Sequence, residues 1–180
     1  MSVKHFQVVL LVFSMFLLKL SQPQTPPSID DPDFNTNIWK ALCSNELPAE
    51  PLRESFPLRL EIFPDPFFNT FSPGQHIRVT LRGIDPSFDF GAFLIRAHST
   101  FDTTAVGEWI GIGLGKAMSC ANEDFEGNDY AAQKNVTLRS YQELIWTAPM
   151  ITGNYVFNLT TSERFMVYWA DQLSHVLRVV

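Results

Sequence analysis

The segment Phe71–Ala97 reads FSPGQHIRVTLRGIDPSFDFGAFLIRA, and it decides the fold class of this chain. Residues 72–75 predict a turn, because proline presets φ and glycine accepts a left-handed backbone that other residues resist. Apolar and polar side chains then alternate over residues 76–82, which is typical of a strand with one buried face and one solvent-facing side. A connection rich in Gly, Pro, Asp and Ser leads to a second, more apolar strand at residues 90–97. Two strands joined in this way predict an all-β extracellular domain.

The rest of the chain repeats this combination of short apolar segments and turn residues. With 16 Phe and 12 Pro, the composition favours short pleated strands that prolines interrupt. Alternation within residues 154–160 divides the side chains into two sets: Tyr155, Phe157 and Leu159 inward, and Val156, Asn158 and Thr160 outward. Further strands are predicted at residues 58–63, 106–115, 144–147, 165–169 and 176–180. About seven to nine short strands of this kind are typical of an antiparallel sandwich.

Residues 1–22 predict a secretory signal peptide. Lys4 precedes a mostly apolar run over residues 6–18, which is shorter than the roughly 20 apolar residues of a membrane-spanning helix. An uncleaved membrane anchor is the alternative interpretation. We expect the signal peptide to be followed by an irregular lead-in at residues 23–40 and by a single domain at residues 41–180.

Composition and charge limit what the domain can bind. The chain is 46% hydrophobic and 18% charged, which indicates one globular domain with a sizeable core rather than a disordered segment. Cleavage would remove Lys4 and Lys19 from the 13 basic residues, so 11 would face 19 acidic residues, a net charge of −8. A protein with this negative net charge is, as a whole, not suited to bind nucleic acid or an anionic membrane. We therefore expect a secreted, extracellular protein with no nucleic-acid partner and no stable membrane insertion.

The two cysteines, Cys43 and Cys120, predict one disulfide. In a secreted chain two thiols most simply pair with each other, and here the bridge would close a loop of nearly eighty residues. In the chain-entropy model a cross-link of this span stabilises the fold by about 4 kcal/mol. Two free cysteines, or an intermolecular bridge, are the alternatives.

Two Asn-x-Thr sequences are candidate N-glycosylation sites, Asn135-Val-Thr137 and Asn158-Leu-Thr160. Strand alternation supports the second, because it places Asn158 opposite the apolar Phe157 and Leu159. The pattern alone also matches asparagines that carry no glycan. Secretion favours modification of both sites.

No segment of the sequence predicts catalysis. Residues 111–116 (GIGLGK) resemble a phosphate loop, but Ile110 and Ala117 stand where such a loop needs Gly and Ser or Thr. We find no Gly-x-Ser-x-Gly motif, no Cys–His signature and no closely spaced histidines for a metal. The acidic loop at residues 123–129 lacks EF-hand spacing, which favours a solvated loop over a calcium site. We therefore expect no enzymatic activity, no cofactor and no metal.

One arrangement of charged residues suggests a ligand site. The first strand of the opening segment carries Arg78 and Arg82 on its solvent-facing side, and Arg96 lies near the end of the second strand. If the two strands lie side by side, these arginines form a basic strip suited to a sulfated or otherwise anionic glycan. If they lie in opposite sheets, the strip does not exist. A solvated strand face is the alternative interpretation.

Several segments, taken in order, resemble the reeler domain, the family found at the N-terminus of reelin and spondin. They are Cys43, the residues FSPGQ at 71–75, the pattern IxVTL at 77–81, FGAFLIRA at 90–97, Val106-Gly107, Cys120, LxWxAP at 144–149 and Tyr168-Trp169. The resemblance covers residues 41–180 and implies an immunoglobulin-like antiparallel β-sandwich in which Cys43 pairs with Cys120. It brings no catalytic residues with it.

The resemblance also suggests a function. Since the chain ends at Val180, it is similar to the stand-alone insect defence proteins of the noduler type, which are linked to innate immunity and to microbial surfaces. We expect a secreted defence protein that binds a microbial surface glycan or lipid. The alternative, which the spondin relatives suggest, is an extracellular-matrix or adhesion module that binds host glycans or a protein partner. Residues 85–89 and 128–130 depart from the relatives, so the ligand is not named by the resemblance.

Overall fold

The computed structural model describes residues 40–41, 43–44, 55–121, 124–133, 137–164 and 167–180. All of them belong to one compact unit, Pro32–Val180. Regular structure within these ranges is almost entirely β, with helical backbone at residues 40–41 and 43–44. No helix in the described part of the chain reaches the length and apolarity that a bilayer crossing requires. The predicted all-β class is therefore confirmed.

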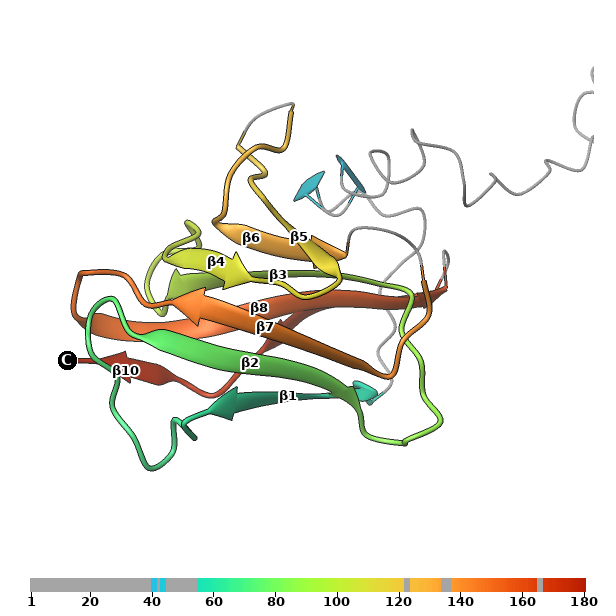
Figure 1. The fold of residues 1–180 in the computed structure, drawn as a ribbon, viewed down its shortest axis with the longest axis horizontal. Coiled ribbons are helices and arrows are strands. Elements are labelled where there is room, and N and C mark those ends of the chain that lie inside the picture. Colours follow the sequence, from blue (N-terminus) through green and yellow to red (C-terminus); the bar gives the residue numbers. More distant parts are fainter. Residues whose placement is uncertain (1–39, 42, 45–54, 122–123, 134–136, 165–166) are drawn as a thin grey trace, which may run out of the picture. The chain divides into compact units, whose positions relative to one another are not determined.

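The described residues form a series of short strands, as the turn-rich sequence predicts. In chain order they are β1 (Leu58–Phe63), β2 (His76–Gly83), β3 (Ala92–Ser99), β4 (Glu108–Gly111), β5 (Gly115–Met118), β6 (Tyr130–Gln133), β7 (Tyr141–Thr147), β8 (Gly153–Arg164), β9 (Val167–Leu173) and β10 (Leu177–Val179). They build two antiparallel sheets (Figure 1). One has the order β1-β2-β7-β4, and the other has the order β10-β8-β3-β6-β5, with β9 paired to β8.

The core between the two sheets is rich in aromatic side chains. Trp146 of β7 packs edge-on against Phe157 of β8, with ring centroids 5.1 Å apart, and Trp109 of β4 lies 5.5 Å from the same phenylalanine. All three rings are buried. The Trp146 Nε1–H donates a hydrogen bond to the Val106 carbonyl at 3.2 Å, so the polar atom of this ring is satisfied inside the core. The two sheets therefore close on each other as a sandwich.

A second, smaller apolar cluster covers part of the outer face of the six-stranded sheet. Its buried members are Leu94, Met118, Phe125 and Ala132, and Cys43, Cys120 and Tyr130 pack against it. Cys43 and Cys120 form a disulfide with 5.5 Å between their Cα atoms, which confirms the predicted pairing. Val156, predicted to face outward, is also buried on this sheet, opposite His98. Alternation predicted the inward residues of β8 correctly. It does not predict which outward-facing residues of the sheet are covered by other parts of the chain.

The strand predicted at residues 106–115 is in fact two strands in different sheets. β4 pairs with β7 in the four-stranded sheet, whereas β5 pairs with β6 in the six-stranded sheet. The chain changes sheets at Gly113, which has a φ of 53°, and the turn is closed by a 2.7 Å bond from the Gly115 N–H to the Ile112 carbonyl. A positive φ suits glycine, which explains how so short a segment makes the reversal.

Removing the central aromatic ring should destabilise the domain strongly. We expect Phe157→Ala to lower the free energy of unfolding by about 3–5 kcal/mol, because its loss leaves a cavity beside two tryptophans. The matched control is Phe101→Ala. Phe101 is 94% exposed, so its loss should change the free energy by about 0.5 kcal/mol or less. Urea unfolding monitored by circular dichroism measures both, and equal effects would contradict this assignment of the core.

The disulfide should contribute to stability through the long loop that it closes. We expect Cys43→Ser combined with Cys120→Ser to lower the free energy of unfolding by about 2–4 kcal/mol, because the unfolded chain gains freedom when the cross-link is lost. Peptide mapping without reduction should recover a peptide pair joined through Cys43 and Cys120. Recovery of both cysteines as free thiols would refute the pairing, whatever the stability of the double variant.

Candidate ligand-binding site

The predicted strip of Arg78, Arg82 and Arg96 does not exist, because its two strands lie in opposite sheets. β2 carries Arg78 and Arg82 in the four-stranded sheet, whereas β3 carries Arg96 in the six-stranded sheet. The outer faces of a sandwich point away from each other, so Arg96 cannot share a ligand with the other two. The connection after Gly83 crosses between the sheets instead of forming a hairpin, and before β3 the backbone of Phe90 exchanges two hydrogen bonds with Arg139, at 2.9 and 3.1 Å.

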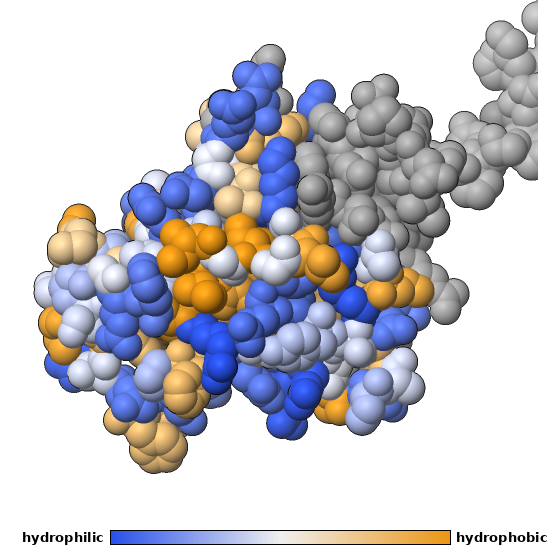
Figure 2. All heavy atoms as spheres, viewed as in Figure 1, coloured by the Kyte–Doolittle hydropathy of each residue, from blue (hydrophilic) through white to orange (hydrophobic). Residues whose placement is uncertain are grey.

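Arg59 of β1 lies on the same outer face of the four-stranded sheet as Arg78 and Arg82. The register places Arg59 directly opposite Arg82, and Phe63 opposite Arg78. On the other side of β2, Tyr141 of β7 lies opposite Arg82. We call this group the arginine face: Arg59, Arg78 and Arg82, together with Phe63 and Tyr141. Figure 2 shows the hydrophilic surface over β1 and β2 beside an apolar area over β4 and β7.

Two aromatic rings hold the guanidinium groups of the arginine face in place. The Cζ atom of Arg78 lies 4.7 Å from the centroid of the Phe63 ring, and that of Arg82 lies 5.8 Å from the centroid of the Tyr141 ring. Both distances are within the range of cation–π attraction. The rings therefore restrict the side chains of Arg78 and Arg82, both of which are exposed.

Arg59 and Arg82 carry like charges at directly opposite positions of neighbouring strands. Side chains in such a pair have Cβ atoms about 4.5–5.5 Å apart, and like charges there are destabilising. Arg59 has one carboxylate nearby, Glu61 at 3.8 Å, but both side chains are well exposed, so this ion pair is weak. A bound anion would remove the repulsion, because guanidinium groups donate paired N–H bonds to phosphate, sulfate or carboxylate.

A hollow of about 450 Å³ opens beside this pair of arginines. It is lined by Arg59, Arg82, Gly83, Ile84, Pro86, Ser140 and Tyr141. One wall is the loop after β2, which folds tightly over Gly83: a Cβ there would lie 2.7 Å from the Asp85 carbonyl oxygen and 2.8 Å from that of Phe88. Glycine is therefore needed at this position for the wall to form.

The same loop is fixed by the carboxylate of Asp85. Its Oδ1 accepts hydrogen bonds from the Ser87 backbone N–H at 2.8 Å and from the Ser87 hydroxyl at 2.7 Å. These two bonds, the backbone one first, hold the pKa of the Asp85 carboxyl below its ordinary value. Since the pKa is lowered in the folded protein, the bonds support the loop at neutral pH and are lost as the pH falls through the folded-state pKa.

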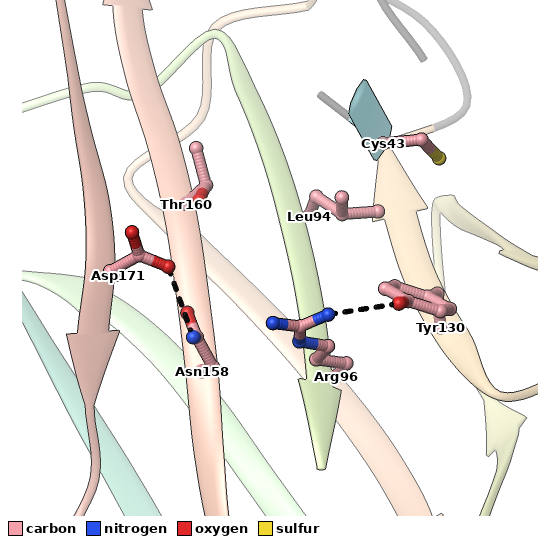
Figure 3. Close-up of a pocket in the computed structure, with 7 residues that line it drawn as sticks. All are labelled: Cys43, Leu94, Arg96, Tyr130, Asn158, Thr160 and Asp171. Carbon is pink, nitrogen blue, oxygen red and sulfur yellow. Dashed lines mark hydrogen bonds between the residues drawn. The ribbon is translucent and has the colours of Figure 1, made fainter. Parts of the chain in front are cut away.

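Arg96 lines a second, smaller hollow of about 180 Å³ on the outer face of the six-stranded sheet (Figure 3). Its Nη1 donates to the Tyr130 hydroxyl at 3.2 Å, and across the hollow the Asn158 Nδ2 donates to the Asp171 Oδ1 at 3.1 Å. Leu94, Thr160 and Cys43 complete the lining. This hollow is polar and holds charges of both signs, so nothing in it selects an anion.

A family model for the reeler domain matches residues 42–180. This chain belongs to the reeler family. One solved structure similar to it is the human F-spondin reeler domain, with 17% identity and a TM-score of 0.59; the match covers 74% of this chain and 94% of that one. Another is the Reelin-N domain of F-spondin, also with 17% identity and a TM-score of 0.59; the match covers 79% of this chain and 98% of that one. At this identity the likeness shows the fold, and it confirms the predicted sandwich. No sequence match to a curated protein reaches significance.

Reeler domains occur in extracellular proteins, F-spondin among them, and this reeler domain carries the disulfide expected in that setting. Asn158 is half-buried, and its amide is engaged by Asp171, so glycosylation at this position stays a prediction. Asn135 lies outside the described residues. Among the described residues no group of three or more His, Cys, Asp or Glu side chains could hold a metal ion.

Sequence reasoning found two of the three arginines of this reeler domain's arginine face and missed the third. The alternation over residues 58–63 was a sufficient signal that Arg59 points outward. The register that places it against Arg82 was not available from the sequence, because it depends on the length and path of the loop at residues 64–75.

The pKa of Asp85 tests the geometry of the wall beside the arginines. We expect the Asp85 carboxyl to titrate below the ordinary aspartate value of about 3.9 in a carbon-detected NMR titration. Ser87→Ala should raise this pKa part of the way, because the hydroxyl donor is lost while the backbone N–H remains. Ser140→Ala, a serine of the same hollow without a bond to Asp85, is the control and should leave the pKa unchanged. A shift of equal size in both variants would refute the Asp85–Ser87 geometry.

Proposed function

We propose that this chain is a secreted recognition protein of innate immunity whose arginine face binds anionic groups on microbial surfaces. The observation that carries the proposal is the pair Arg59 and Arg82, opposite each other at the edge of an open hollow with Tyr141 beside them. The protein as a whole is acidic, with a net charge of −6. A local concentration of arginines on an acidic protein favours binding to one small anionic group over binding to any polyanion.

The mode of binding follows from the geometry of the arginine face. Each guanidinium presents several N–H donors in one plane, which matches two oxygens of a phosphate, sulfate or carboxylate. Phe63 and Tyr141 are 61% and 46% exposed, so their rings are available to the apolar faces of sugar rings. Phosphorylated or acidic saccharides of a bacterial surface combine both kinds of group.

Secretion is supported by three observations of different kinds. The N-terminal 22 residues have the charge and apolar length of a signal peptide. The described domain contains a disulfide, which persists in oxidising compartments. The family is found in extracellular proteins. We propose binding without catalysis, since the arginine face supplies donors and charge but no nucleophile or acid–base pair.

The alternative function is that of an extracellular-matrix module, which the likeness to F-spondin reeler domains favours. The same arginines would then hold the sulfate groups of a host glycan. The two functions differ in the ligand and share the site, so one set of variants can separate them.

Loss of the opposed arginines should weaken binding to an anionic saccharide. We expect Arg59→Gln combined with Arg82→Gln to weaken binding to deacylated lipopolysaccharide about tenfold or more, since each removes a charge-assisted hydrogen bond. Arg96→Gln is the control, because it removes one positive charge from the opposite sheet and should change nothing. Isothermal titration calorimetry measures the affinities, and whole-bacterium pull-down gives the cellular result.

Other outcomes of this experiment are informative. Retention on heparin without binding to bacteria or to deacylated lipopolysaccharide, abolished by the Arg59/Arg82 double variant, would favour the matrix function. Binding to bacteria that survives the double variant would show that the arginine face is not the site. Equal losses in the double variant and in Arg96→Gln would point to unspecific attraction by charge.

A further inference from the structure

Five of the six most exposed large apolar side chains among the described residues lie on three loops at one end of the sandwich. The loops join β1 to β2, β3 to β4 and β7 to β8, and in Figure 1 they lie at the left. They carry five large apolar side chains, each between 73% and 94% exposed: Phe67, Phe68, Phe101, Met150 and Ile151. We call these five residues the loop tips. Monomeric proteins scatter single apolar side chains over their surface, so this concentration at one end calls for a partner.

The sheet register shows that the three loops share one end. β1 ends where β2 begins, with Phe63 opposite Arg78, and the first residue of β2, His76, lies opposite Thr147, the last residue of β7. The last residue of β3, Ser99, lies opposite Tyr155 near the start of β8, which places the β3–β4 loop at the same end. The Gly74 N–H donates to the Ala148 carbonyl at 3.1 Å and so connects the β1–β2 and β7–β8 loops, and the Thr100 N–H donates to the Asn154 carbonyl of β8 at 3.0 Å. The three loops that carry the loop tips therefore lie at the same end of the two sheets.

We propose that the loop tips insert into the outer leaflet of a zwitterionic lipid bilayer and dock the domain reversibly on a membrane surface. Insertion of this kind is shallow, and it differs from the spanning helix that the sequence argues against. It uses residues other than those of the arginine face and does not depend on the function proposed for that face.

The separation of the loop tips favours lipid over a protein partner. Side chains that packed together would shield one another, yet Phe101 is 94% exposed and Phe68 is 84% exposed. The ring contacts among these residues are those of Phe67 with Phe68, at 6.1 Å, and with His175 of the neighbouring turn, at 5.3 Å. A protein partner would need a separate pocket for each projecting side chain, whereas acyl chains close around each one.

Several backbone N–H groups near the loop tips are already hydrogen-bonded within the protein, as an environment with little water requires. The Phe67 N–H donates to the Asp65 Oδ1 at 2.9 Å, and the Phe68 N–H donates to the Asp65 carbonyl at 3.2 Å. The N–H groups of Phe101 and Asp102 both donate to the Ser99 hydroxyl, at 3.2 and 2.9 Å. Unpaired backbone groups are costly in a membrane, so these internal bonds remove a barrier to insertion.

The charges at this end favour a zwitterionic surface over an anionic one. Asp65 and Asp102 lie on the inserting loops, and the pKa of the Asp102 carboxyl is held below its ordinary value by the Thr104 backbone N–H and then by the Thr104 hydroxyl. Arg178 of β10, opposite Asn154, is an exposed cation near the same end. Exposed Glu108, opposite Thr147, and exposed Arg78, opposite Phe63, add one charge of each sign at this end. Three carboxylates against two guanidinium groups give no net attraction for an anionic leaflet.

Co-sedimentation of the full chain with phosphatidylcholine vesicles tests the proposal. We expect the wild type to bind, and Phe67→Ser combined with Phe68→Ser, or Phe101→Ser alone, to weaken binding about tenfold or more, because each removes buried apolar area. Leu114→Ser is the matched control: Leu114 is 73% exposed, lies on the turn between β4 and β5 and should not matter. Binding should persist at about 0.5 M salt, where charge attraction is screened.

A second measurement reports insertion directly. In Phe101→Trp, lipids brominated near the headgroup should quench the added fluorescence, and the wild-type chain with its four native tryptophans, measured in the same lipids, is the reference. Absence of vesicle binding, loss of binding at high salt, or equal losses in Leu114→Ser and the loop variants would each overturn the proposal. The loop variants should keep their affinity for deacylated lipopolysaccharide, and Arg59→Gln with Arg82→Gln should keep vesicle binding, so the two proposals fail separately.

Discussion

The packing of Trp146 and Trp109 against Phe157 is the contact on which the rest of this domain depends. Two of these rings come from the four-stranded sheet and one from the six-stranded sheet, so their burial joins the two layers. Because the inner faces of the two sheets pack against each other in this core, their outer faces must point in opposite directions. The separation of Arg96 from Arg78 and Arg82 is a direct result of that constraint.

Because the core fixes the scaffold, binding groups can occupy positions that do not help it fold. Arg59 and Arg82 face each other as like charges, and the loop tips expose aromatic rings that a larger core would have buried. Both features lower stability somewhat in the free protein. In the two proposals each cost is offset by a ligand of one kind, an anion for the arginines and a lipid phase for the loop tips. A sandwich with one strongly packed interior can tolerate both at its surface.

The sequence predicted what depends on local pattern and failed where the outcome depends on the path of the chain. Alternation predicted the strands at residues 58–63, 76–82 and 154–160 and the inward side chains of β8. The two cysteines and their compartment predicted the disulfide. Alternation says nothing about which sheet a strand joins, so Arg96 was wrongly grouped with Arg78 and Arg82 under the side-by-side assumption. Register is equally non-local, which is why Arg59 was not recognised as the partner of Arg82.

The alternation of consecutive strands between the two sheets also bears on how the domain reaches its native state. β2 and β3, β4 and β5, and β7 and β8 each follow one another in the chain and enter different sheets. The central strand pairs therefore join distant segments, as when Arg82 meets Tyr141, and the chain must close long loops before those contacts form. The strands of the two sheets also interleave along the chain, since β4 and β7 of the four-stranded sheet lie between β3 and β8 of the six-stranded sheet. A break of the chain anywhere between β3 and β7 would therefore separate paired strands in both sheets, β2 from β7 and β3 from β8.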